Sequence, residues 1–209
     1  IEINTESDYG KYHLEVTSDI VANLVLKSKT ITIGKSAAEH PDYDALLALY
    51  NSTDGANWTN PWDLTKPIST WFGITFNSDN RVELLDIYRN NLIGNIPSEI
   101  GDLTTLKMLN LFDNKLTGEI PIELWNLTNL TDLRLGFNNL VLSNGIPSEI
   151  SNLTGLELLN LSTIKLSQPI QPELFNLPKL NRLIIEYCAL KGNLPKEFAE
   201  IRDVFTSSN

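Results

Sequence analysis

The sequence of 209 residues has one cysteine, two histidines and few basic side chains. A single cysteine excludes an intrachain disulfide. Lysine and arginine total 16 against 26 aspartates and glutamates, and the formal net charge of −10 argues against nucleic acid and anionic membranes as partners. The sequence also has no apolar run near the roughly 20 residues that span a bilayer, so we expect no membrane insertion.

Motifs of catalysis are missing as well. His13 and His40 are the two histidines, and H-E-x-x-H, C-x-x-C, G-x-S-x-G and a phosphate-binding loop do not occur. Asp54, Asn57 and Asp63 lack the regular oxygen spacing of a calcium loop and are typical of turns. We therefore expect a protein that is not an enzyme and that binds no cofactor and no metal.

What the sequence does contain is a repeat with a period of 24 residues. The apolar positions that begin at Val82 recur from Leu106, and turn-forming and polar positions recur with them, pairing Asn90 with Asn114, Gly94 with Gly118 and Pro97 with Pro121. A third copy from Leu130 carries two extra residues, a fourth starts at Leu156, and a shortened fifth starts at Leu180. A fixed period of this length predicts stacked repeats.

Each copy contains L-x-x-L-x-L, in which alternating apolar positions face one side, as in a short strand. One copy cannot enclose a core, so the copies must stack. An asparagine follows the first three strands, where a buried amide satisfies backbone groups at the bend. We expect a ladder of Asn90, Asn114 and Asn138, broken at Ile164 and occupied in the fifth copy by Cys188, a residue that tolerates burial.

The skeleton L-x-x-L-x-L-x-x-N-x-L-x-G-x-I-P resembles the plant-type leucine-rich repeat. The match is strong over Val82–Leu156 and weaker to Val204, where Gln168 replaces the glycine and Pro172 stands one place late. The resemblance implies an α/β fold: a right-handed solenoid with a parallel concave sheet, extended or 3₁₀ segments on the convex face, and a helical N-terminal cap.

The sequence divides into four predicted parts. They are an extension or linker (1–36), the N-terminal cap (37–81), about five repeats with a truncated C-terminal cap (82–203) and a tail (204–209). Phe198, Ile201 and Val204 are spaced like a short closing helix. The first residue is not methionine, so we expect a processed or trimmed product whose export signal lies outside this chain.

The predicted cap contains the stretch ALLALYNSTDGANW, which is similar to the cysteine-free caps of bacterial secreted and surface members of the family. Phe76 stands where plant caps carry a cysteine. A cap must cover the end of the leucine core. We expect four aromatic side chains to do so, namely Trp58, Trp62, Trp71 and Phe72.

Residues that alternate with the inward leucines are expected to face outward on the concave sheet, where the family usually places its ligand contacts. They form three columns: Asp86, Asn110, Arg134, Asn160 and Ile184; then Tyr88, Phe112, Gly136, Ser162 and Glu186; then Arg89, Asp113, Phe137, Thr163 and Tyr187. The candidate ligand contacts are Asp86, Tyr88, Arg89, Asn110, Phe112, Asp113, Arg134, Phe137 and Tyr187.

Four aromatic rings beside charged groups form a surface that can stack on sugars or anchor a protein. Aromatic residues also favour strands for their own sake, so a structural role stays open. Gly136 beside Phe112 is expected to leave a shallow hollow, and the insertion within Val141–Asn144 to disturb the convex edge.

The sequence thus predicts a non-catalytic recognition module that binds a protein or a polysaccharide through its concave face, outside the cell or at its surface. Much of this rests on analogy of fold. A structural or adhesion spacer of a larger surface protein and an inhibitor of a polysaccharide-degrading enzyme remain alternatives. A weak homodimer through open edges or the aromatic face is also open. The missing disulfides indicate a reducing compartment or a bacterial exported protein.

Overall fold

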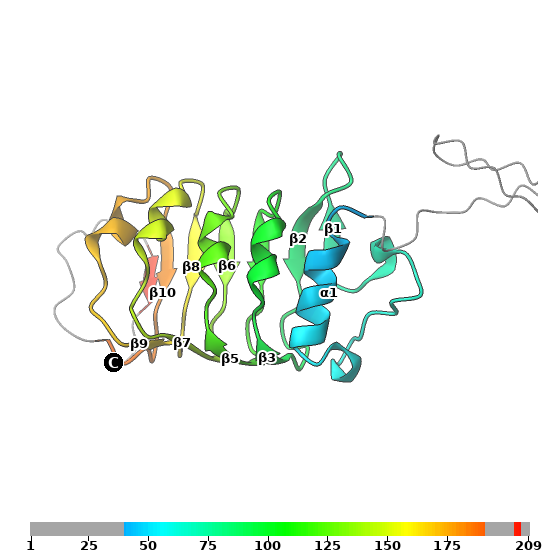
Figure 1. Ribbon diagram of the computed structural model, residues 1–209. Coiled ribbons are helices and arrows are strands. Elements are labelled where there is room, and N and C mark those ends of the chain that lie inside the picture. The colour runs from blue at the N-terminus through cyan, green and yellow to red at the C-terminus, as the bar shows by residue number, and fades with distance from the viewer. Residues whose placement is uncertain (1–39, 191–202, 206–209) are drawn as a thin grey trace, which may run out of the picture.

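The computed structural model describes residues 40–190 and 203–205, which form a solenoid of stacked coils (Figure 1). The predicted extension 1–36, the start of the predicted cap, and Phe198 and Ile201 of the predicted closing helix lie outside the described residues. Strands and short 3₁₀ helices recur in a fixed order along the coils. The α/β solenoid expected from the sequence is confirmed.

Seven strands form the concave sheet. In spatial order they are β1 (Ile74–Phe76), β2 (Val82–Asp86), β4 (Met108–Asn110), β6 (Asp132–Arg134), β8 (Leu158–Asn160), β10 (Arg182–Ile184) and β11 (Asp203–Phe205). β1 is antiparallel to β2, and the other pairs are parallel. Equivalent repeat positions lie opposite each other, as Leu85, Leu109 and Leu133 do. Each of the strands β2, β4, β6, β8 and β10 therefore adds its inward leucine to one buried row.

A second parallel sheet runs beside the first, which the sequence did not predict. Its strands are β3 (Ile93–Asn95), β5 (Lys115–Glu119), β7 (Asn139–Leu142) and β9 (Lys165–Leu166). Stacked extended segments satisfy their N–H and C=O groups on the neighbouring coil. Gly118 has a φ of +79°, a backbone conformation that favours glycine, and a Cβ there would lie 2.8 Å from Asn95 Oδ1.

The convex side is made of 3₁₀ helices, as the resemblance implied. They are η4 (Ser98–Asp102), η5 (Ile122–Asn126), η6 (Ser148–Asn152) and η7 (Pro172–Asn176). The first three begin directly after a proline, whereas η7 begins on Pro172 itself. Proline fixes φ near the helical value and lacks the N–H that a first turn would leave unpaired. The one-place shift of Pro172 is therefore absorbed at the helix start.

The core lies between the two sheets and the 3₁₀ helices. In the first coil Leu85, Leu92, Ile100 and Leu103 have no exposed area. Full burial of one such side chain contributes about 2 kcal/mol. Because each coil is covered by the next one, stability depends on stacking, and a single coil has no core of its own.

The N-terminal cap closes one end of this core. Helix α1 (Tyr43–Ser52) packs beside η4 of the first coil and is followed by η2 (Gly55–Asn57) and η3 (Ile68–Thr70) (Figure 1). Trp62 is buried, with its ring centroid 4.8 Å from those of both Trp58 and Trp71. Phe72 is 44% exposed, so the shielding role predicted for it is wrong. Three tryptophans, rather than four aromatics, provide the buried cluster.

Asp42, just before α1, joins the cap to β2. The residue is 1% exposed. Its Oδ1 accepts hydrogen bonds from Arg81 Nε at 2.9 Å and Nη2 at 2.6 Å, and its Oδ2 accepts one from Val82 N at 2.7 Å. The hydrogen bonds to Asp42 raise the pKa of the Arg81 guanidinium. One buried carboxylate therefore fixes the cap to the first repeat strand.

The predicted C-terminal boundary is wrong at β11. The sequence placed Val204 in a closing helix and began a tail at residue 204, whereas 203–205 pair in parallel with 182–184. Asp203 N donates to Asn181 O at 2.9 Å. The unpaired edge of β10 offers backbone groups that a further strand satisfies, and the spacing of apolar residues carries no information about that edge.

The two-residue insertion does not interrupt the second sheet. Val141 and Leu142 remain in β7 and pair with Lys165 and Leu166 of β9. The backbone N and the hydroxyl of Ser143 both donate to the Glu119 carboxylate. The disturbance expected at this edge is therefore confined to the turn that follows β7.

Thr163 adopts an unfavourable backbone conformation, with a φ of +67°. β-branched residues are rare in this region, whereas asparagine is enriched there. Thr163→Asn is expected to raise the free energy of unfolding by about 0.5–1 kcal/mol in a denaturant titration, because strain of this kind costs on the order of 1 kcal/mol. Thr154→Asn, at an exposed position outside the positive-φ set, serves as the control and should change little. Equal effects of the two changes would contradict the strain argument.

Candidate binding surface on the concave sheet

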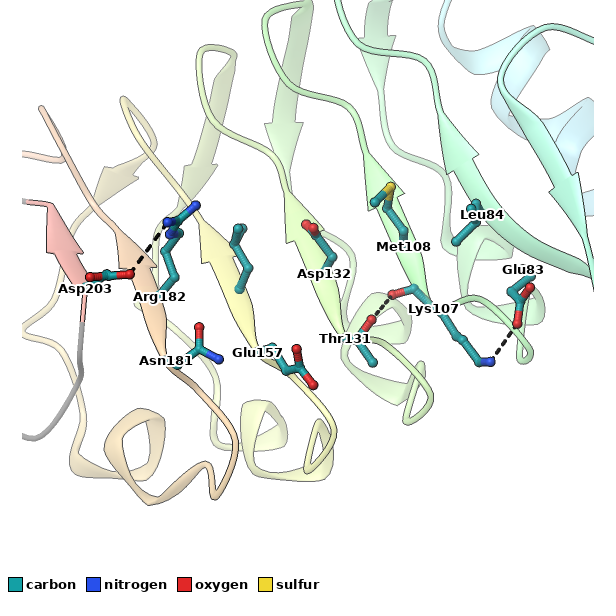
Figure 2. Close-up of a pocket in the computed structure, with 11 residues that line it drawn as sticks. Glu83, Leu84, Lys107, Met108, Thr131, Asp132, Glu157, Asn181, Arg182 and Asp203 are labelled. Carbon is teal, nitrogen blue, oxygen red and sulfur yellow. Dashed lines mark hydrogen bonds and ion pairs between the residues drawn. The ribbon is translucent and has the colours of Figure 1, made fainter.

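Two rows of side chains line a groove across the concave sheet (Figure 2). The first row is Glu83, Lys107, Thr131, Glu157 and Asn181, and the second is Leu84, Met108, Asp132, Leu158 and Arg182, with Asp203 at the far end. The groove extends from β2 to β11 and has a volume of about 680 Å³. Each row repeats one position of the L-x-x-L-x-L pattern, so the stacking of coils builds the groove.

Three ion pairs hold charged groups in and beside the groove. The pairs are Lys107–Glu83 at 2.6 Å, Arg134–Asp132 at 2.6 Å and Arg182–Asp203 at 3.6 Å. Hydrogen bonds to Asp132 raise the pKa of the Arg134 guanidinium. Leu84, Met108 and Leu158 are half-buried between these charges. The groove thus combines an apolar floor with fixed charges.

A smaller hollow of about 340 Å³ adjoins the groove on the same strands. It is lined by Asp86, Tyr88, Arg89, Asn110, Phe112, Arg134 and Asn160. Six of the nine predicted ligand contacts therefore meet in one place, and Asn160 joins them. Arg134 belongs to the hollow while its partner Asp132 belongs to the groove. This ion pair fixes a cation between the two depressions.

The other three predicted contacts lie outside the hollow. Asp113 Oδ2 accepts a hydrogen bond from Arg89 Nε at 2.6 Å, between side chains that are both substantially exposed. The ring of Phe137 packs on Phe112 with centroids 5.1 Å apart, and it remains 42% exposed. Tyr187 is 57% exposed and lies beyond β10 at the other end of the sheet. The four aromatics therefore do not form one continuous patch.

The predicted third column does not lie on the sheet. Its five members share a left-handed backbone, with φ between +50° and +67°: Arg89, Asp113, Phe137, Thr163 and Tyr187. They occupy turns beyond the ends of the strands, at the rim of the concave face. A left-handed residue departs from the extended conformation of a strand, so the alternation that the prediction extended past the strand no longer applies there.

Two predictions for the second column are also wrong. Gly136 and Ser162 are buried rather than outward-facing. A Cβ on Gly136 would lie 2.5 Å from Asn160 Oδ1, so the space expected beside Phe112 is filled by a polar side chain. The hollow instead extends over β2, β4, β6 and β8.

Asn110 contributes to the site in a different way from the one predicted. It is 6% exposed, its Nδ2 donates to Asp86 Oδ1 at 2.8 Å, and its Oδ1 accepts from Phe112 N at 3.2 Å. These bonds orient Asp86 and the turn after β4. Asn110 thus supports the floor of the hollow and exposes little area to a ligand.

The asparagine ladder runs beneath this surface. Asn114 Oδ1 accepts from Asn90 N and Leu92 N at 2.9 and 3.1 Å, and its Nδ2 donates to Ile87 O and Leu111 O at 3.1 and 3.0 Å. Asn138 repeats this arrangement one coil later, accepting from Leu116 N and donating to Leu111 O and Leu135 O, each within 3.0 Å.

The ladder has different endings in the cap and in the last coils. Asn90 Oδ1 accepts from both the N and Nδ2 of Asn60, a cap residue that the repeat pattern does not include. Ile164 supplies no amide, and the carbonyl of Leu161 accepts instead from Ile164 N at 3.0 Å and the Cys188 thiol at 3.1 Å. Burial raises the pKa of that thiol to about 12, so it stays protonated as a donor.

Sequence reasoning missed the groove because it began the outward columns one position too late. Alternation along β2 places Leu84 outward before Leu85, and Met108, Asp132, Leu158 and Arg182 are its equivalents. Carrying the period of two back by one outward position would have found this row. The outward position that holds leucine twice and methionine once was hidden among the core leucines.

Within residues 40–190 and 203–205, no group of three or more His, Cys, Asp or Glu side chains is arranged to hold a metal ion. In the same part of the chain, none of the helices has the length and apolar character needed to cross a membrane.

The repeat region matches a known family. The family described as "Leucine-rich repeat region" aligns with residues 84–202, more than half of the chain. The chain belongs to the leucine-rich repeat family. A probable leucine-rich repeat receptor-like protein kinase of Arabidopsis thaliana is 40% identical over 67 residues, which are 32% of this chain and 7% of that protein. This chain therefore corresponds to a small part of that relative's length.

Several solved structures share the fold. The BIR2 ectodomain from Arabidopsis thaliana superposes with a TM-score of 0.70 at 28% identity, covering 79% of this chain and 92% of that one. A plant ice-binding protein gives 0.67 at 29% identity, covering 80% and 55%. The plant peptide hormone receptor RGFR1, in complex with RGF2, gives 0.55 at 27% identity, covering 66% and 29%. Proteins of different function therefore share this solenoid, and its ligand must be argued from the surface.

Proposed function

We propose that this protein is a non-catalytic recognition module that binds a peptide segment of a partner protein on its concave sheet. The groove from β2 to β11 carries the proposal, because it crosses the repeat strands and combines an apolar floor with fixed charges. A surface of that kind buries apolar side chains and orients polar ones. The similarity to the plant peptide hormone receptor RGFR1, solved in complex with RGF2, supports this class of ligand.

The lining of the groove favours a peptide over a polysaccharide. Its apolar floor is aliphatic, formed by Leu84, Met108 and Leu158, and none of the described residues that line it is aromatic. Aromatic rings provide flat apolar faces on which sugar rings can stack, and the described lining of this groove offers none. Of the exposed aromatic rings, Tyr88 lines the smaller hollow and Phe137 lies at the rim.

We further propose that the protein acts outside the cell or at its surface, as the ectodomain relatives do. Because the formal net charge of the chain is −10, its recognition surface is suited to partners that are not strongly anionic. Polysaccharide binding, an adhesion spacer and enzyme inhibition remain the alternatives that the binding experiment distinguishes.

The test is selection of random linear 12-residue peptides on the purified chain, followed by affinity measurement with two variants. Met108→Glu places a charge in the groove floor, and we expect it to weaken binding of the selected peptides at least tenfold because apolar contact is lost and a carboxylate is desolvated. Ile122→Glu makes the same chemical change at a 47% exposed residue of η5 on the convex side and should leave affinity within twofold.

Peptides that bind Met108→Glu as tightly as the unaltered chain would overturn the groove as the site. The chain could instead bind a polysaccharide, with binding lost in Phe137→Ala and unchanged in Met108→Glu. That result would assign the function to the aromatic residues at the rim.

A further inference from the structure

The groove holds one carboxylate whose charge is not neutralised by its neighbours. Four cations stand on or beside the described concave rows, and each lies near a carboxylate, in the pairs Arg89–Asp113, Lys107–Glu83, Arg134–Asp132 and Arg182–Asp203. Glu157 is exposed, and no described side chain forms an ion pair or hydrogen bond with its carboxylate. The groove therefore carries a surplus of negative charge at one known position.

The surroundings of Glu157 give that charge a defined setting. Its neighbours in the first row are the neutral side chains Thr131 and Asn181 (Figure 2). The backbone of Glu157 is fixed on both sides, since its N donates to Thr131 O at 2.8 Å and its O accepts from Asn181 N at 3.0 Å. Leu158, the next residue, forms part of the apolar floor. A carboxylate beside an aliphatic surface suits a side chain with an apolar stem and a cationic head.

Spacing sets the length of ligand that fits. Adjacent strands lie about 4.8 Å apart, so the row from β2 to β10 extends about 19 Å, which corresponds to about six residues of extended peptide. A basic residue over β8 would place ligand residues about three and four positions away over Met108 of β4 and Leu84 of β2.

We propose that the groove selects a peptide with a lysine or arginine that binds Glu157, flanked on one side by apolar residues that pack on Leu84 and Met108. This rests on the proposed function and names the ligand chemistry of the same site. Arginine and lysine differ in geometry, and an arginine fork matches a carboxylate with two parallel hydrogen bonds. The arrangement therefore favours arginine.

The experiment repeats the 12-residue peptide selection on the unaltered chain and on Glu157→Gln. Lysine or arginine should be enriched at a recurring position among peptides selected on the unaltered chain, and this enrichment should disappear on Glu157→Gln. Glu173→Gln, at an exposed residue of η7 on the convex side, is the matched control and should retain it. Both residues are exposed, so thermal unfolding should be unchanged.

A double-mutant cycle gives the decisive measurement. Replacing the basic residue of a selected peptide by glutamine should weaken binding to the unaltered chain about fivefold, the size expected of a solvent-accessible ion pair. The same replacement should change binding to Glu157→Gln less than twofold.

Three results would overturn the inference. One is that the selected peptides depend on Met108 but show no enrichment of a basic residue. Another is that the replacement in the peptide and Glu157→Gln have additive effects in the cycle. Either result would leave the proposed function intact and remove Glu157 as its determinant. A selection that yields no binding peptide would remove both.

Discussion

Asn114→Ala is expected to lower the free energy of unfolding by about 4 kcal/mol. The side chain amide of Asn114 holds two backbone N–H groups and two carbonyls of adjacent coils, each within 3.1 Å. Asn90 N and Leu92 N would lose their acceptor in a buried setting, and a buried unsatisfied group costs roughly 1–3 kcal/mol. The effect is large because one side chain joins two coils, and solenoid stability is a sum of such neighbour contacts.

Equilibrium unfolding in guanidinium chloride, followed by circular dichroism, measures this loss. Asn139→Ala makes the same chemical change at an exposed residue of β7 that makes no side-chain hydrogen bond to the described residues, and it should change stability by less than about 0.5 kcal/mol. A loss below about 1 kcal/mol for Asn114→Ala would show that the ladder does not join the coils.

Asp42→Asn is expected to lower the free energy of unfolding by about 3 kcal/mol and to release the cap first. The carboxylate is buried and accepts three hydrogen bonds, two from Arg81 and one from Val82 N. An amide is uncharged and replaces one acceptor oxygen by a donor, so at least one of these bonds is lost. Breaking a buried ion pair from one side costs roughly 3–5 kcal/mol, and the lower end applies because the Arg81 side chain is 28% exposed.

Tryptophan fluorescence separates the cap from the repeats in this experiment. Three of the four tryptophans, Trp58, Trp62 and Trp71, lie in the cap, and Trp125 lies in η5. In Asp42→Asn the unfolding transition followed by fluorescence should have a lower denaturant midpoint than the transition followed by circular dichroism. Asp79→Asn, an exposed aspartate in the turn between β1 and β2, removes the same charge and should leave both transitions in place. If the two variants shifted the unfolding midpoints equally, the link between Asp42 and β2 would not be specific to that carboxylate.

The repeat could be predicted because its cause is local. Leucines at fixed spacing have to be buried whatever lies beyond the next coil, so the repeat predicts Leu85, Leu109 and Leu133 in one row, where the structure has them. The asparagine after each strand follows the same logic, since a bend orphans backbone groups in every copy. The buried tryptophans of the cap belong here too, because an open end of a leucine core has to be covered.

The candidate surface was predicted less well because the exposure of an outward side chain depends on residues in the neighbouring repeat. Gly136 is buried by Asn160 of the following coil, and nothing in its own repeat indicates this. Phe137 and Tyr187 were assigned to the sheet, but a positive φ turns them to the rim. The groove floor was overlooked because Leu84, Met108 and Leu158 resemble core residues in sequence.

The sequence by itself determined the period, the stacked core, the asparagine ladder and the absence of catalytic motifs, because each depends on residue type and spacing within one coil. Only the tertiary structure decided the second sheet, the strand at 203–205, the link between Asp42 and Arg81, and the groove with its exposed Glu157. These features arise where segments far apart in the chain meet. Backbone pairing, ion pairing and exposure depend on contacts between these distant segments. They are therefore fixed by the stacking of coils and not by the pattern within any one coil.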